Sequence, residues 1–71
     1  TAIEDRIDAD LRLGHHAALI GELQALVKAH PLRERVWGQL MQSLYRTGRQ
    51  ADALRAYQDL RTALADEVGL D

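Results

Sequence analysis

The sequence has no cysteine, which excludes disulfide bonds and thiolate-bound metal sites. It has one tryptophan, two tyrosines and no phenylalanine, too few aromatic rings for a surface that stacks on bases. No apolar run approaches the roughly 20 residues that span a bilayer, and no signal-peptide pattern opens the chain. We therefore expect a cytoplasmic protein that makes no contact with a membrane.

Strong positive charge is also lacking. The formal net charge is −2 and the pI is about 5.8, whereas nucleic-acid-binding domains usually have a pI above about 9. Direct binding of nucleic acid by this segment is therefore not expected. The 71 residues suffice for one small domain with a thin core. Because the chain begins with Thr1 rather than Met, we expect residues 1–71 to be a single partial domain.

Alanine and leucine are abundant and β-branched residues are scarce, which favours an all-α fold. The apolar residues recur at helical spacing, and this predicts four antiparallel helices over about 2–13, 17–30, 32–47 and 50–68. Gly14 and Gly48 are expected to end the first and third helices, and Gly69 the fourth. Pro31 should end the second helix and stand near the first turn of the next.

An internal repeat organises these helices. Sliding the chain along itself until Gly14 falls on Gly48 aligns six apolar pairs. They are Ile3 with Trp37, Ile7 with Met41, Leu11 with Tyr45, Ile20 with Leu54, Leu23 with Tyr57, and Leu26 with Leu60. The separation of Gly14 and Gly48 equals the length of a tetratricopeptide repeat, and each such repeat contains two helices. The second unit also keeps Trp37-x-x-Leu40 and Ala53-x-x-x-Tyr57 of that pattern.

The repeat predicts two tetratricopeptide-like helical hairpins, at about residues 1–31 and 32–68, that form part of an α-solenoid. The side chains expected in the core are Leu19, Leu23, Leu40, Tyr57 and Leu60. Within the helices, Gly21 and Gly38 suggest close helix–helix approach. Two units alone would leave apolar surface at both ends, to be covered by missing segments, a cap helix or a second copy.

Several longer runs resemble a narrower family. They are Ala29-His30-Pro31-Leu32-Arg33-Glu34-Arg35, the stretch 39–54, and Leu64-Ala65-Asp66-Glu67-Val68-Gly69-Leu70. Together they resemble the bacterial transcriptional activator domain of actinobacterial regulators of the Streptomyces antibiotic regulatory type. The resemblance implies a tetratricopeptide-like domain that follows a winged-helix DNA-binding domain, with this chain as its C-terminal portion. It also implies transcription regulation, with the DNA binding located outside this segment.

No constellation for catalysis is apparent, and we expect no enzyme, no cofactor and no metal. The carboxylates lie off the apolar stripes, which predicts solvated faces; they are Glu4, Asp5, Asp8 and Asp10 on the first helix and Asp66 and Glu67 near the end of the chain. Asp8 and Arg12 are spaced to pair within that helix. The adjacent histidines 15 and 16, and His30 in a last turn, lack metal-ligand spacing and are expected in solvent.

The third helix carries the best candidate surface. Arg35, Gln39, Gln42 and Arg46 recur at spacings of four, three and four, so they share one polar face. Residues 1–31 carry five acidic and three basic side chains, whereas residues 32–61 carry six basic and three acidic ones. We therefore predict that these four residues bind an acidic peptide or helix of a protein partner; an ordinary solvated arginine-rich surface is the alternative.

The sequence as a whole favours a protein-interaction or self-association module of a bacterial transcriptional regulator. Its partners would be a second copy in a homodimer, other domains of the same regulator, or the transcription machinery. The alternative is a tetratricopeptide-like adaptor or scaffold unrelated to transcription. A DNA-binding helix-turn-helix is disfavoured because no helix clusters basic residues at its N-terminus.

Overall fold

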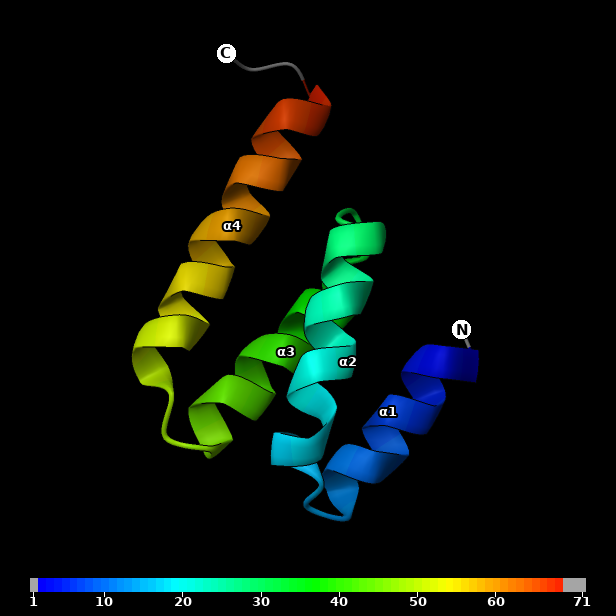
Figure 1. The fold of residues 1–71 in the computed structure, drawn as a ribbon. Helices are drawn as coiled ribbons and strands as arrows, with labels where there is room; N and C mark the ends of the chain where they lie inside the picture. Colours follow the sequence, from blue (N-terminus) through cyan, green and yellow to red (C-terminus); the bar gives the residue numbers. More distant parts are fainter. Residues whose placement is uncertain (1, 69–71) are drawn as a thin grey trace.

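A computed structural model describes residues 2–68 as four helices. They are α1 (Ala2–Arg12), α2 (His16–Ala29), α3 (Glu34–Arg46) and α4 (Gln50–Val68). Successive helices run antiparallel, and α3 packs against each of the other three, while α1 and α4 lie at opposite ends of the array (Figure 1). Residues 2–68 contain no strand. The predicted all-α arrangement of two helical hairpins is therefore confirmed.

The glycines predicted the helix bounds more accurately than the proline did. Gly14 and Gly48 have φ angles of +83° and +80°, the left-handed conformation that ends α1 and α3 as predicted. Helix α2 ends at Ala29, before Pro31, but α3 begins only at Glu34. The expectation that Pro31 stands near the first turn of α3 is wrong, because residues 31–33 form a turn before the helix. The carbonyl of Pro31 accepts a hydrogen bond from Nε1 of Trp37 at 2.8 Å. The predicted stop at Gly69 lies outside the described residues.

The core draws buried side chains from all four helices. They are Ile7, Leu11, Leu19, Ile20, Leu23, Val27, Val36, Trp37, Leu40, Leu44 and Ala56. Burial of Leu19, Leu23 and Leu40 is confirmed, and Leu60 is partly buried against the same cluster. The prediction for Tyr57 is wrong, since 47% of its surface is exposed. No described helix packs over that part of α4.

Gly21 and Gly38 do not mark close helix contacts. A methyl group at either position would meet no atom within 4 Å, so the prediction of a close approach is wrong. Both glycines lie on exposed faces of their helices. Their presence therefore has no packing reason in this fold, and each costs helix stability relative to alanine.

Candidate interaction site

Polar side chains gather between α1 and α3. Within residues 2–68 there is no group of three or more His, Asp or Glu side chains that could hold a metal ion, and no helix long and apolar enough to cross a membrane. Of the histidines, His15 and His30 are exposed, as predicted, whereas His16 is partly buried. Nδ1 of His15 lies 3.9 Å from the carboxylate of Asp10. The candidate site is therefore built from the polar side chains between α1 and α3.

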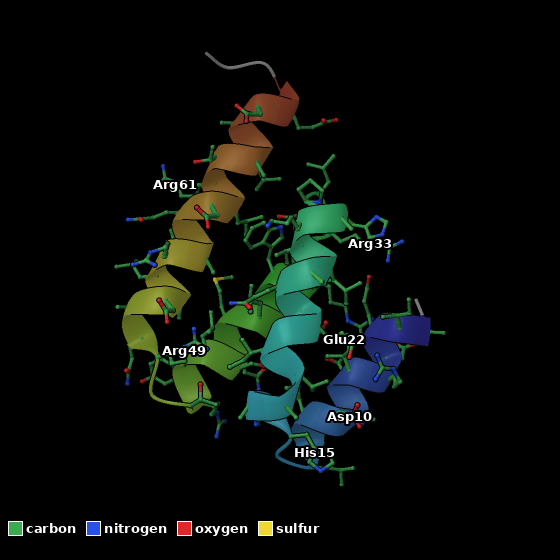
Figure 2. All side chains as sticks on the ribbon, viewed as in Figure 1. Asp10, His15, Glu22, Arg33, Arg49 and Arg61 are labelled. Carbon is green, nitrogen blue, oxygen red and sulfur yellow. The ribbon has the colours of Figure 1, made fainter. Side chains whose placement is uncertain are left out.

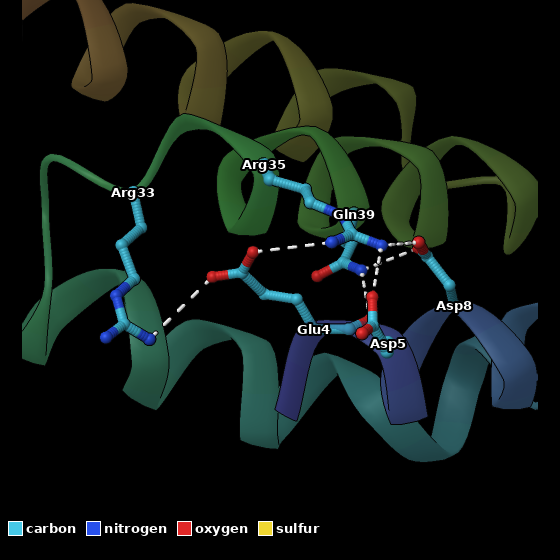
Figure 3. A network of polar contacts seen from close by, with 6 residues as sticks. All are labelled: Glu4, Asp5, Asp8, Arg33, Arg35 and Gln39. Atoms are coloured by element: carbon cyan, nitrogen blue, oxygen red, sulfur yellow. Dashed lines mark hydrogen bonds and ion pairs between the residues drawn. The ribbon is translucent and has the colours of Figure 1, made fainter. Parts of the chain in front are cut away.

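One guanidinium joins three carboxylates across this interface (Figure 3). Arg35 of α3 lies 3.6 Å from the carboxylate of Glu4 and 3.1 Å from that of Asp5, and it donates a hydrogen bond to the carboxylate of Asp8. Arg33, just before α3, adds a second cation 3.7 Å from Glu4. The acidic face of α1 is thus neutralised by the start of α3.

A buried amide lies at the centre of the same contact. Gln39 is 4% exposed, and its Nε2 donates hydrogen bonds to the main-chain oxygen of Glu4 at 3.0 Å and to Oδ1 of Asp8 at 2.7 Å. Glu4 itself is 8% exposed, which places this part of the network away from solvent. Hydrogen bonds between buried groups fix the register of the two helices, because an unmade one leaves a buried polar group unsatisfied.

The network changes the titration of two of its members. The hydrogen bond from Gln39, followed by the hydrogen bond and charge of Arg35, lowers the pKa of Asp8 below its ordinary 3.8, although partial burial opposes the shift. The hydrogen bonds to Asp8 and then Asp5 raise the pKa of Arg35 above its usual value. Both groups are therefore fully charged at neutral pH.

This arrangement corrects part of the predicted solvated face: Asp5 on α1 and Asp66 and Glu67 on α4 are exposed as expected, but the other carboxylates of α1 are not. Glu4 is buried and Asp8 is only partly exposed, because α3 covers them. Within the described residues, Asp8 pairs with Arg35 rather than with Arg12, whose charge acts on it only at longer range. Helical spacing shows which residues share a face but not which helix will cover that face. The sequence signal for this pairing was the excess of acidic side chains in residues 1–31 and of basic side chains in residues 32–61.

The four residues predicted to contact a partner are divided by the structure. Arg35 and Gln39 belong to the α1–α3 network, whereas Gln42 and Arg46 lie one and two turns further along α3. These two line an open hollow of about 590 Å³ together with Asp8, Leu11, Arg12, Gly14 and His16. Only Gln42 and Arg46 are therefore placed to meet a ligand without breaking the contact between helices.

The last hairpin exposes an apolar surface, as the sequence predicted for an end of the array that no further unit covers. Tyr45, Leu54 and Tyr57, which we call the apolar edge, are 63%, 59% and 47% exposed. Each stands one repeat period after a buried residue of the first hairpin, namely Leu11, Ile20 and Leu23. In the first hairpin α3 packs over these positions, and no described helix does so in the second. The apolar edge is thus the face of a repeat unit that no further unit covers within the described residues.

The opposite end of the array is polar. Arg6, Asp10 and Glu22, which we call the polar edge, stand one repeat period before the buried Leu40, Leu44 and Ala56. Arg6 lies 3.4 Å from Asp10 and also pairs with Glu22, and all three side chains are at least partly exposed. Figure 2 shows Asp10 on α1 and Glu22 on α2. The polar edge resembles a terminal cap of a repeat array, which keeps its outer face polar. The two ends of the array are therefore chemically different.

Comparison with known proteins gives one family. The model of the bacterial transcriptional activator domain matches residues 1–71. Over 69 residues the chain is 56% identical to the regulatory protein AfsR of Streptomyces coelicolor and 46% identical to the regulatory protein DnrI of Streptomyces peucetius.

Over 76 residues the chain is 41% identical to the transcriptional regulatory protein EmbR of Mycobacterium tuberculosis. Each of these three matches covers 97% of the chain but only 7%, 25% and 20% of the respective relative. The chain thus corresponds to a small part of each of these regulators. No solved structure matches the chain.

Proposed function

Because the chain belongs to the bacterial transcriptional activator domain family, we propose that it serves a transcriptional regulator as a protein-interaction module. In this proposal it carries out no catalysis, and the regulator binds DNA through a segment outside these residues. The relatives are themselves named as regulatory proteins, which favours this role over an adaptor unrelated to transcription.

The apolar edge is the observation that carries the proposal. Tyr45, Leu54 and Tyr57 are each close to half exposed or more, although the chain is small enough to need every apolar contact for its core. Grouped apolar surface of this kind marks a site of protein contact, and tyrosine is among the side chains enriched in such contacts. A partner that covers this edge would be another part of the regulator, a second copy of the chain or a component of the transcription machinery.

The charge distribution supports placing DNA binding elsewhere. Arg33 and Arg35 are paired with carboxylates of α1 and are therefore not available to phosphates. The formal net charge of −2 adds a general repulsion from a nucleic-acid backbone. A regulator that contains this segment would bind DNA through a basic surface on another domain.

A double substitution at the apolar edge tests the proposal. Leu54→Gln with Tyr57→Gln, introduced into the regulator that contains this chain, should abolish promoter activation in a reporter assay. The same variant should retard a promoter fragment in a gel as the unmodified regulator does. Gln58→Ala, an exposed change on the same helix, serves as the matched control and should leave both readouts unchanged.

Two results would contradict the proposal. Parallel loss of promoter binding and activation would indicate that the segment takes part in DNA recognition. Undiminished activation by the double variant would show that the apolar edge has no partner. Light scattering on the isolated chain separates the modes of contact, because a strictly monomeric chain would remove self-association.

A further inference from the structure

The arginines of this chain differ in whether the fold neutralises them. Five of the eight form ion pairs, namely Arg6, Arg33, Arg35, Arg49 and Arg55. Within residues 2–68 the other three, Arg12, Arg46 and Arg61, form none. Arg12 comes from the last turn of α1 and Arg46 from the last turn of α3, yet both line the same hollow. The fold thus brings to one cavity two arginines that form no ion pair within the described residues.

The acidic side chain of the hollow offsets these charges only in part. Asp8 is the only carboxylate in the lining, and it already accepts hydrogen bonds from Gln39 and Arg35. The remaining lining supplies the amide of Gln42, the apolar side chain of Leu11 and backbone at Gly14. Two guanidinium groups near one another repel unless an anion lies between them.

Helix α2 adds to the positive potential on this side. Its first residue, His16, lines the hollow, and the N-cap residue His15 makes no side-chain hydrogen bond to the helix. The uncapped N–H groups of a helix start carry partial positive charge and attract anions. Nε2 of His16 is also buried without a hydrogen-bond partner. The hollow therefore combines two arginine cations with an unsatisfied helix terminus.

We propose that this hollow binds the side-chain carboxylates of an acidic segment in a partner protein. The inference rests on the proposed function and names the chemistry of the partner. Each guanidinium can hold a carboxylate through two parallel hydrogen bonds, a geometry that lysine would not provide. The hollow, of about 590 Å³, has room for more than one such group.

Protein carboxylates fit this site better than a nucleic-acid backbone does. A duplex presents a continuous line of phosphates and is bound by a stripe of basic residues along a protein face. Here the two cations are confined to one hollow and do not form a stripe along a face. A short acidic segment can place its carboxylates in that hollow, whereas a duplex would find no continuous basic surface beside it.

Binding of a fluorescein-labelled hexaglutamate peptide to the 71-residue chain tests the inference by fluorescence anisotropy. We expect salt-sensitive binding that is absent with a hexaglutamine peptide. Arg12→Gln and Arg46→Gln should each weaken it about tenfold, because each removes a charge-assisted hydrogen-bonding group. Arg61→Gln removes an equally unpaired charge outside the hollow and should leave the affinity unchanged. Circular dichroism should show the same unfolding transition for all three variants.

Three outcomes would overturn the inference. They are no binding of hexaglutamate by the unmodified chain, an equal loss of affinity in Arg61→Gln, and tighter binding of a duplex DNA than of hexaglutamate. The first two remove the acidic partner but leave promoter activation dependent on the apolar edge, so the proposed function would stand. Undiminished activation by the apolar-edge variant, with hexaglutamate binding retained, would remove the proposed function alone.

Discussion

The buried side-chain amide of Gln39 donates a hydrogen bond to the main-chain oxygen of Glu4, 3.0 Å away, and so ties the middle of α3 to the first turn of α1. Gln39→Leu should lower the free energy of unfolding by about 1–3 kcal/mol, because it removes two hydrogen bonds between α3 and α1, one of them to the charged carboxylate of Asp8. Gln42→Leu, on the exposed face of the same helix, should change it by less than about 0.5 kcal/mol. Urea denaturation followed by circular dichroism measures both, and equal losses would contradict the role given to Gln39.

The Asp8 contact should make stability depend on acid pH. Because hydrogen bonds from Gln39 and Arg35 lower its pKa in the folded chain below the ordinary 3.8, this contact contributes fully above that value. The contribution is lost as the pH falls through the lowered pKa. Between neutral pH and about pH 3, the unmodified chain should therefore lose more stability than Asp8→Asn.

Asp59→Asn is the matched control for this pH series. Asp59 is exposed on α4 and forms no ion pair within residues 2–68, so its variant should keep the pH dependence of the unmodified chain. Thermal unfolding at a series of pH values gives the comparison. A pH dependence that is the same in Asp8→Asn and the unmodified chain would rule out the proposed linkage.

The four described glycines should respond to alanine with opposite signs. Gly14→Ala and Gly48→Ala should each cost about 1 kcal/mol, because a Cβ is strained at φ angles of +83° and +80°. Gly21→Ala and Gly38→Ala should instead stabilise by up to about 1 kcal/mol, since both lie within helices and open space surrounds them. Thermal melts of the four single variants test this, and a uniform sign would be incompatible with the helix boundaries.

Trp37 should be needed for more than its volume. Its indole N–H bonds the Pro31 carbonyl at 2.8 Å while the ring is 6% exposed in the core, so Trp37→Phe should destabilise by about 1–3 kcal/mol. Tyr45→Phe, on the exposed apolar edge, should change stability by less than about 0.5 kcal/mol. Chemical denaturation reports both values. A Trp37→Phe variant as stable as the unmodified chain would show that the Pro31 contact contributes little.

The helical hairpins could be predicted because their signals are local. Gly14 and Gly48 adopt the left-handed conformation without a Cβ penalty and so suit helix ends, and the apolar spacing of three and four survives in the buried core. The start of α3 was predicted less well, because proline permits a helix to begin beside it but does not require one, and α3 begins only at Glu34. Tyr57 was misplaced because its burial requires a neighbouring helix, which no local pattern supplies.

The surroundings of the four candidate contact residues were harder to predict than the fold. The spacing of Arg35, Gln39, Gln42 and Arg46 does place them on one helix, but the packing of α1 engages the first two and leaves the others in the hollow. Which side chains stay free depends on the register between α1 and α3, two helices that are not consecutive in the chain. That register is set by buried contacts such as Gln39 with Glu4, which periodicity alone does not encode.

The contrast between the polar and apolar edges limits how copies of this chain can assemble. A head-to-tail contact would bury Arg6 and Glu22 of one copy against Leu54 and Tyr57 of the next, leaving charges without water in an apolar contact. Such heterologous contacts are the ones that propagate into filaments. Two apolar edges can instead meet about a two-fold axis, and that contact uses both of them. If the apolar edge mediates self-association, such a contact would favour a closed dimer over a filament.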